Sequence, residues 1–392
     1  MTSHNGSAPP ISASLTSTPL DPAPLGSLPS GPAPLDPAPL TPAPGREQIR
    51  HLVRQFPAGR VTGALLRALA ALPFADRPFG WLERHPALHG TLLSAFGLRR
   101  PIFIDHPVHP EPRFGYGRPD HPRIAALLER GRDHYADRLT GFLALDEHLA
   151  AIPVRDRPDG TVPYWDNGWL PPLDALALYG TLARTAPRRY VEIGSGNSTK
   201  FARRAIGDHG LRTHVTSIDP APRANVDALC DTVVRRPLER VDPRFFADLQ
   251  AGDVVFLDGS HRVFMGSDVT VFFFEVLPLL RPGVLVQLHD ILLPRDYPPE
   301  WRWRHYSEQY LLAAFLLADP ARFDVELPNA FVDGDERLRA LVEPLWRRLS
   351  LTESYRPASF WMRIRDRPAG SSDERTASTG GPATEGTGGP AA

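Results

Sequence analysis

The second half of this chain alternates short apolar runs with helical patterns, and this alternation constrains the fold more than any other feature. The apolar runs predict strands at 189–194, 214–219, 232–236, 253–258, 284–289, 323–327 and 359–364. The intervening patterns predict helices at 198–206, 224–229, 242–249, 268–280 and 307–317. Strand and helix units of this length favour an α/β fold with a doubly wound parallel sheet, which binds ligands at the carboxyl ends of its strands.

The two chain ends differ in composition from the middle. Residues 1–45 repeat Pro-Ala-Pro-Leu, which is typical of solvated polyproline II, and residues 368–392 are rich in Gly, Ser, Thr and Pro. We predict that both are disordered tails. Apolar residues three and four apart predict a mainly helical region over 46–170, and the α/β domain is expected over 171–367.

Charge and cysteine content exclude several classes of function. The net charge of −1 provides no overall attraction to nucleic acid or an anionic membrane, and no apolar stretch is long enough to span a bilayer. Cys230 is the only cysteine, so neither an intramolecular disulfide nor a thiolate zinc cluster can form. We therefore expect a cytoplasmic protein without nucleic-acid or membrane partners, and the sequence leaves the oligomeric state open.

The strongest local signal is the segment Tyr-Val-Glu-Ile-Gly-Ser-Gly-Asn-Ser-Thr at 190–199, where an apolar strand runs through two glycines into a helix. Gly194 and Gly196 allow a tight turn, and the helix N-terminus offers unpaired N–H groups to a nucleotide-like ligand. Thr199 stands where a dinucleotide site prefers Gly or Ala. Glu192 would repel a pyrophosphate but suits a ligand with an ammonium group. Both residues disfavour a nicotinamide dinucleotide.

Asp219 ends the second predicted strand, about twenty residues beyond the glycines. An acidic residue at this place can accept hydrogen bonds from both ribose hydroxyls. The structural alternative is a helix N-cap or a turn. Together with the upstream glycines, the position favours a ribose contact.

These segments resemble class I S-adenosylmethionine-dependent methyltransferases. The resemblance rests on Val-Glu-Ile-Gly-Ser-Gly at 191–196, Ser-Ile-Asp at 217–219, Val-Phe-Leu-Asp-Gly-Ser-His at 255–261, and Leu-Arg-Pro-Gly at 280–283 leading to His289 and Asp290. The chain is most similar to the small-molecule branch related to macrocin O-methyltransferases. The resemblance implies a Rossmann-like sheet of seven strands whose last strand is antiparallel, with S-adenosyl-L-methionine as cofactor.

The resemblance also implies roles for individual residues. Residues of the glycine segment would hold the methionine portion, Asp219 the ribose, and Asp258 would lie beside the sulfonium. The expected cofactor-binding residues are Glu192, Gly194, Ser195, Gly196, Asn197, Ser198, Asp219, Asp258 and Gly259.

The candidate catalytic residues are His261, His289 and Asp258, which follow two neighbouring strands together with Asp290. Related enzymes hold a magnesium ion at these strand ends, and Asp258 with Asp290 matches that pattern. Histidine stands where a third oxygen ligand is expected, and magnesium prefers oxygen. The alternative is that His261 or His289 acts as general base, since imidazole titrates near neutral pH. A purely structural role for either histidine also stays open.

Two aromatic segments are candidates for shaping the acceptor pocket, namely 164–169 and 296–310. Their rings either cover the ligand or pack the N-terminal region on the sheet. We predict a methyltransferase that acts on a hydroxyl of a small molecule, such as a sugar or a secondary metabolite. The alternatives are a nicotinamide-dependent oxidoreductase and a catalytically silent cofactor-binding or scaffold protein.

Overall fold

The computed structural model describes residues 110–156, 160–222, 225–351 and 356–366. Both predicted tails and the helical patterns before residue 110 lie outside the described residues. The described part begins with three helices, α5 (Pro122–Glu129), α6 (Arg132–Leu143) and α7 (Asp146–Ala150). These three helices lie within the region 46–170 that the sequence predicts to be mainly helical, and the extent of that region stays a prediction.

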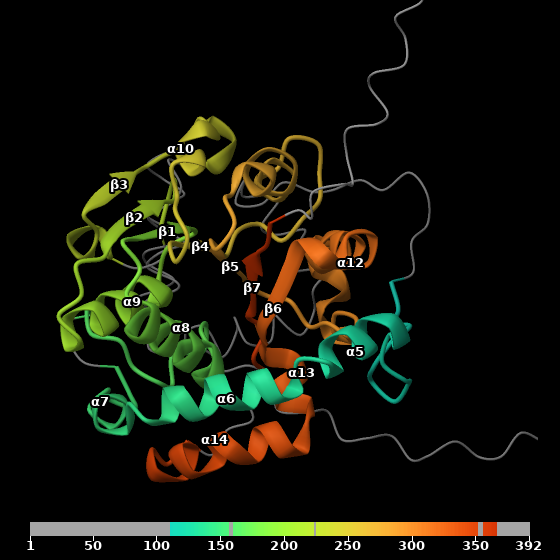
Figure 1. Ribbon diagram of the computed structural model, residues 1–392, viewed down its shortest axis with the longest axis horizontal. Helices are drawn as coiled ribbons and strands as arrows, with labels where there is room; N and C mark the ends of the chain where they lie inside the picture. Colours follow the sequence, from blue (N-terminus) through green and yellow to red (C-terminus); the bar gives the residue numbers. More distant parts are fainter. Residues whose placement is uncertain (1–109, 157–159, 223–224, 352–355, 367–392) are drawn as a thin grey trace, which may run out of the picture. The chain divides into compact units, whose positions relative to one another are not determined.

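Seven strands form one sheet in the order β3-β2-β1-β4-β5-β7-β6 (Figure 1). The strands are β1 (Arg189–Ile193), β2 (His214–Ile218), β3 (Thr232–Val234), β4 (Val254–Leu257), β5 (Leu285–Leu288), β6 (Phe323–Pro328) and β7 (Phe360–Ile364). The first five pair in parallel, whereas β7 runs antiparallel to both β5 and β6. The expected Rossmann-like sheet with an antiparallel last strand is therefore confirmed.

The central strands are apolar because both faces of the sheet are covered. Every residue of β4 and β5 is buried, and continuous apolar runs are typical of parallel strands between two helical layers. The longer helices are α8 (Pro172–Thr185), α9 (Asn197–Asp208), α12 (Glu308–Ala318) and α14 (Glu336–Arg348), with the short α13 (Asn329–Gly334) between β6 and α14. Within the described ranges, none of the helices could cross a membrane.

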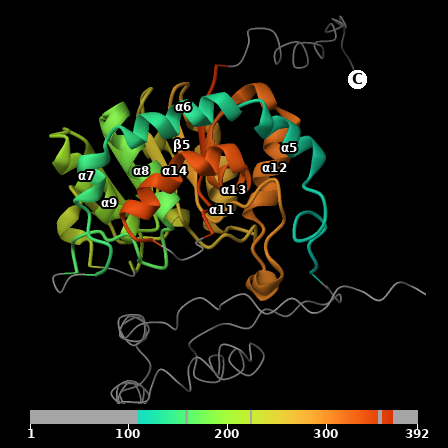
Figure 2. The same cartoon turned by 90° about the horizontal axis from the view of Figure 1, so that it is seen from below.

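The two faces of the sheet carry separate apolar clusters. Tyr190, Phe256 and Trp361 pack on one face with side chains of α6, α8, α9 and α14. Val191, Val255 and their neighbours pack on the other face with side chains of α5, α12 and the segment after β4. Figure 2 shows α6 beside α8 and α14, so α6 lies on the first face while α5 lies on the other.

Three predicted helices differ from the observed elements. The helix expected over 224–229 is the 3-10 turn η1 (Asp227–Leu229), and the one expected over 242–249 is reduced to α10 (Arg244–Ala247), with the 3-10 turn η2 (Leu238–Arg240) before it. Such short segments offer too few packed residues to offset helix nucleation.

The helix expected over 268–280 begins as α11 (Asp268–Val271) and then changes into the π turn η3 (Phe272–Val276) and the 3-10 turn η4 (Leu277–Leu279). Pro278 lacks the N–H that an α-helix would need at this position. The remaining short elements are η5 (Pro299–Arg304) and η6 (Pro320–Arg322).

Candidate active site

The glycine loop between β1 and α9 is held between the ends of β2 and β4. Gly194 has φ +81°, and a Cβ at this residue would collide with the carbonyl oxygen of Asp258. The Gly194 N–H donates to the Ile218 carbonyl at 3.0 Å, and the Asp258 N–H donates to the Ile193 carbonyl at 2.9 Å. The left-handed backbone and the close approach together require glycine. The loop therefore lies between the strand ends that carry Asp219 and Asp258.

Glu192, expected to face a ligand's ammonium group, is completely buried in β1. The Tyr190 hydroxyl donates to its Oε1 at 2.9 Å, and the Thr199 hydroxyl donates to its Oε2. Burial raises the pKa of Glu192 to about 7, although these hydrogen bonds act in the opposite direction. The carboxyl group thus already has partners inside the protein and ties β1 to the first turn of α9. Its direct contact with a ligand stays a prediction.

Thr199 completes this connection from the helix side. Its hydroxyl oxygen accepts a hydrogen bond from the Gly196 N–H at 3.1 Å while the hydroxyl donates to Glu192. The side chain is fully buried, so it fills the position that Gly or Ala takes in a dinucleotide site. Thr199 therefore links the glycine loop to β1.

Asp219 lies just after β2 and is half-buried. Its Oδ2 accepts from the Ser195 N–H at 2.8 Å, and its Oδ1 accepts from the Ala221 N–H at 2.7 Å. A carboxylate oxygen has a second lone pair, so each oxygen can still accept a hydrogen bond from a ribose hydroxyl. Behind it, Arg235 donates to the Asp219 carbonyl and to the Ser217 hydroxyl, both at 3.1 Å. This arrangement fixes the carboxylate against the glycine loop.

The first turn of α9 leaves space for a ligand. A Cβ on Gly196 would meet no other atom within 4 Å, and the turn carries no acidic residue. The N–H groups of Asn197 and Ser198 belong to this turn, where the helix dipole favours negative charge. These features fit the carboxylate end of an amino-acid-like ligand, and a ribose contact by Asp219 stays a prediction.

Asn167 organises the aromatic segment 164–169 next to this turn. Its Oδ1 accepts from the N–H groups of Leu170 at 2.7 Å and Trp169 at 3.0 Å, and from the Asn197 side chain at 3.1 Å. Trp165 is fully buried and belongs to the core, whereas Trp169 is 48% exposed. Core packing is therefore established for Trp165, and a covering role for the rest of the segment stays a prediction.

Four charged side chains meet at the ends of β4 and β5, as the sequence predicted. The Nε2 atom of His261 lies 3.2 Å from Asp258 and 3.4 Å from Asp290. The Nδ1 atom of His289 lies 3.5 Å from Asp290 and 3.9 Å from Asp258. Both imidazoles are buried, and Asp258 has the most exposed side chain of the four at 32%. A ligand at this edge reaches Asp258 before either histidine.

His261 is held from behind by the N-terminus of α12. Its Nδ1 lies 2.9 Å from Oε2 of the fully buried Glu308, and its carbonyl accepts from the N–H groups of Ser307 and Glu308. Its ring also packs on Tyr306, with 4.6 Å between centroids. Burial lowers the pKa of His261, but Asp290, Asp258 and Glu308 outweigh it and raise that pKa well above its usual value.

His289 is held by Asp174, a buried residue of α8. The His289 Nε2 lies 3.4 Å from Asp174 Oδ2 without hydrogen-bonding geometry. The Asp174 carboxylate also accepts from the N–H groups of Ala358 and Ser359, at 2.8 and 3.0 Å, and from the Asn329 amide at 2.7 Å. Burial lowers the pKa of His289, but Asp258, Asp174 and Asp290 raise it well above its usual value.

The surrounding carboxylates affect the protonation of both candidate bases. They raise the pKa of His261 and of His289 and so favour the protonated imidazoles, while burial raises the pKa of Asp290 less than the two histidines lower it. A protonated imidazole cannot accept a proton from a hydroxyl. The carboxylates are the other groups at this edge that can accept a proton, and a base role for either histidine stays a prediction.

The predicted magnesium site at Asp258 and Asp290 is not supported. Across the described residues, no group of three His, Cys, Asp or Glu side chains is arranged to hold a metal ion. The two carboxylates instead face His261 Nε2, and nitrogen is a poor ligand for magnesium. The residues present at this edge do not fit the ion.

Gly259 has a structural reason to be glycine. A Cβ there would collide with the Asp268 carboxylate, which accepts from the Ser260 N–H at 2.6 Å and from the Ser260 hydroxyl at 2.5 Å. This arrangement connects the loop after β4 to the start of α11. A cofactor contact by Gly259 stays a prediction.

The aromatic residues of the segment 296–310 pack mainly on one another. Tyr297 is buried and stacks on Trp301, and both contact Tyr306. Trp303 is 58% exposed. Packing is therefore established for the first three rings, and a covering role for this segment stays a prediction.

Comparison with known proteins is consistent with this geometry. A family model described as a methyltransferase domain matches residues 191–291, which run from β1 to just beyond β5. The matched segment is therefore similar to methyltransferase domains. It contains the glycine loop, Asp219 and the four charged residues at the ends of β4 and β5.

Solved structures of methyltransferases are similar to the chain. An SAH-bound methyltransferase from Podospora anserina is 16% identical, with a TM-score of 0.32, over 57% of this chain and 88% of that chain. A Thermobifida fusca protein assigned as a methyltransferase is 13% identical, with a TM-score of 0.26, over 50% of this chain and 79% of that chain. No curated protein sequence matches the chain.

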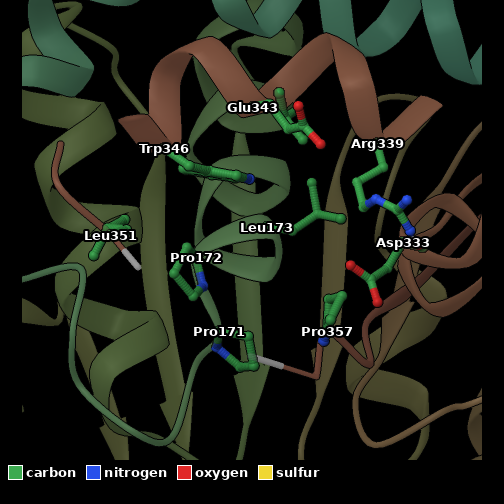
Figure 3. A pocket seen from close by; sticks show the side chains of 10 residues that line it. Pro171, Pro172, Leu173, Asp333, Arg339, Glu343, Trp346, Leu351 and Pro357 are labelled. Carbon is green, nitrogen blue, oxygen red and sulfur yellow. Dashed lines mark hydrogen bonds between the residues drawn. The ribbon is translucent and has the colours of Figure 1, made fainter. Parts of the chain in front are cut away.

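A pocket of about 210 Å³ lies between the start of α8, α14 and the residue before Ala358 (Figure 3). Its lining is mainly apolar, with one tryptophan, two acidic residues and one arginine. The lining residues are Pro171, Pro172, Leu173, Asp333, Arg339, Val342, Glu343, Trp346, Leu351 and Pro357. Two of these residues, Leu173 and Pro357, directly precede Asp174 and Ala358 in the chain, and the Ala358 N–H donates to the Asp174 carboxylate at 2.8 Å.

Proposed function

We propose that this chain transfers a methyl group from S-adenosyl-L-methionine to a hydroxyl of a small molecule. One observation carries the proposal: the glycine loop, Asp219 and Asp258 converge at one carboxyl edge within the segment that matches a methyltransferase domain. Parallel sheets of this type bind their ligands at that edge.

The residues at this edge match the chemistry of the cofactor. Asp219 would accept the ribose hydroxyls, and the first-turn N–H groups at Asn197 and Ser198 would meet the carboxylate of the methionine portion. Gly196 leaves room for this portion to approach the backbone. When bound, S-adenosyl-L-methionine supplies a methyl group attached to an electrophilic sulfonium.

Asp258 is the residue to which we assign the contact with the acceptor. Its side chain is the most exposed of the four charged groups, and its main chain contacts Gly194. With the cofactor bound, an acceptor hydroxyl held at Asp258 would receive its methyl group, and the electron pair of the broken carbon–sulfur bond would stay on sulfur. The hydroxyl proton passes to a carboxylate of this edge, and His261 and His289 fix the positions of the carboxylates.

The pocket beside Asp174 supports a hydroxyl-bearing acceptor. Trp346 offers a ring face on which a sugar or a fused ring can stack, and Asp333, Glu343 and Arg339 can bind hydroxyl groups. Apolar contacts with Leu173 complete the lining. These residue types favour a small ring compound with several hydroxyls, such as a sugar or a polycyclic metabolite.

The proposal is tested by thermal unfolding with S-adenosylhomocysteine and, in parallel, with NAD. A ligand at a hundred times its Kd stabilises the native state by about 2.7 kcal/mol, which moves the midpoint by several degrees. We expect stabilisation by S-adenosylhomocysteine alone, and its loss in Asp219→Ala. Asp324→Ala is the matched control, because Asp324 is exposed near the start of β6, at the opposite edge of the sheet.

The same experiment separates the alternatives. Stabilisation by NAD alone would make the chain a nicotinamide-dependent oxidoreductase and refute the proposal. Stabilisation by neither ligand would favour a scaffold protein without a cofactor. An Asp219→Ala variant that binds S-adenosylhomocysteine like the wild type would refute the ribose contact but not the cofactor.

A further inference from the structure

We infer that the imidazole of His261 occupies the place of a divalent cation between Asp258 and Asp290, so that this chain binds no metal ion there. Its Nε2 atom lies 3.2 Å from Asp258 Oδ1 and 3.4 Å from Asp290 Oδ2. One ring nitrogen thus faces both carboxylates, and an ion bridging them would have to displace it. The geometry of this inference does not depend on the proposed reaction; its consequence for catalysis rests on the proposed function.

The imidazole cannot move aside without breaking several contacts. On its other side, Nδ1 lies 2.9 Å from the fully buried Glu308. The His261 carbonyl accepts from the N–H groups of Ser307 and Glu308, at 2.8 and 3.2 Å. Val263, two residues further along the chain, is also fixed, because its N–H donates to the Ser307 hydroxyl at 2.8 Å. Residues at the start of α12 therefore hold the loop after β4 through the imidazole ring and through the backbone of residues 261 and 263.

The backbone of His261 lies in the left-handed region, with φ +60°. Non-glycine residues are uncommon there, and the conformation persists where surrounding contacts hold it. This conformation presents Nε2 to the carboxylates while Nδ1 faces Glu308. Glu308 is therefore a positioning residue, which acts on the carboxylate pair only through the imidazole.

The second histidine gives the same carboxylates a further nitrogen neighbour. His289 Nδ1 lies 3.5 Å from Asp290 Oδ1 and 3.9 Å from Asp258 Oδ1. Within the ranges that the structure describes, no group of three His, Cys, Asp or Glu side chains is arranged to hold a metal ion. A hard cation such as Mg²⁺ requires about six oxygen ligands, several of them water, and two nitrogen neighbours disfavour it.

The inference is tested by titrating Mn²⁺ into the full chain and measuring the free ion by electron paramagnetic resonance. Mn²⁺ has the oxygen preference of Mg²⁺ and is directly visible in this measurement. The wild type should bind no Mn²⁺ at the carboxylate pair. The double variant His261→Asn, Glu308→Gln should gain one site, at least about tenfold tighter than any site of the wild type, because an amide oxygen replaces the imidazole.

The design of the variant follows from the structure. Asparagine tolerates the left-handed backbone at residue 261 better than other non-glycine residues, and the Glu308→Gln change avoids an unpaired buried charge. Adding Asp290→Asn to the double variant should abolish the new site, which assigns it to the carboxylate pair. Binding of S-adenosylhomocysteine, measured by calorimetry on every variant, tests the proposed function separately.

Two results would overturn the inference. The first is stoichiometric Mn²⁺ binding by the wild type that disappears in Asp290→Asn, because the carboxylate pair would then hold a cation despite the imidazole. The second is a folded double variant without a new site, because the imidazole would then not be what excludes the ion. If the double variant does not fold, comparison of the wild type with the Asp290→Asn single variant still decides whether the carboxylate pair binds Mn²⁺.

Discussion

Replacing Glu192 by glutamine should change the pH dependence of stability in a defined direction. Glu192 is fully buried in β1, and burial raises its pKa from the ordinary value of 4.5 to about 7. The folded chain therefore binds this proton more tightly than the unfolded chain does. The stability that the carboxyl group contributes is complete below pH 4.5 and is lost as the pH rises through 7.

The size of the effect follows from the size of the shift. A shift from 4.5 to about 7 corresponds to about 3 kcal/mol at roughly 1.4 kcal/mol per pKa unit. Glu192 is fully buried, so solvent does not weaken this effect. Glutamine carries no charge at any of these pH values, and its amide can still bond to the hydroxyls of Tyr190 and Thr199.

The assay is urea unfolding of the wild type and Glu192→Gln at a series of pH values between 4.5 and 8.5. In the difference in unfolding free energy between the two proteins, the contributions of the other titrating groups cancel. We expect the wild type to lose about 3 kcal/mol relative to the variant across this range. Glu129→Gln, on the exposed surface of α5, controls for the removal of one carboxylate. A wild-type minus variant difference that stays constant with pH would refute the reasoning.

Two further changes test the loop and the pocket. Gly194→Ala should abolish S-adenosylhomocysteine binding in calorimetry, because the new Cβ would collide with the Asp258 carbonyl and because φ at this residue is +81°. The control Gly207→Ala should bind normally, since a Cβ at this helical glycine would meet no other atom within 4 Å. Unchanged binding by Gly194→Ala would contradict the assigned role of this loop. Trp346→Ala should raise KM for a hydroxylated ring acceptor about tenfold or more with little change in kcat, since loss of stacking weakens substrate binding alone. Steady-state kinetics check this, and an equal fall in kcat would place Trp346 in the reacting centre instead.

The sequence predicted the sheet well because each strand is encoded locally. A strand buried on both faces must be a short apolar run, so the runs that end before Gly194, Asp219, Asp258 and His289 marked the carboxyl edge directly. The helix after β4 was predicted less well. Its apolar pattern continues through Phe272 and beyond, whereas the observed helix changes type at that residue.

Asp174 and Glu308 could not be found from the sequence as parts of the site. Each lies at the start of a helix, where an acidic residue is ordinarily explained by the helix dipole. Asp174 is 115 residues from His289 in the chain, and Glu308 is 47 residues from His261. Only the packing of α8 and α12 against the sheet brings these carboxylates to the imidazoles.

The sequence by itself determined which residues reach the carboxyl edge, because strand and turn positions depend on neighbouring residues. It suggested a metal ion between Asp258 and Asp290, or a neutral histidine as base. Only the tertiary structure decided what surrounds these groups, because burial and distance depend on elements far apart in the chain. It places His261 between the two carboxylates, Glu308 behind it and Glu192 in the core, and these contacts set the charge that each group carries.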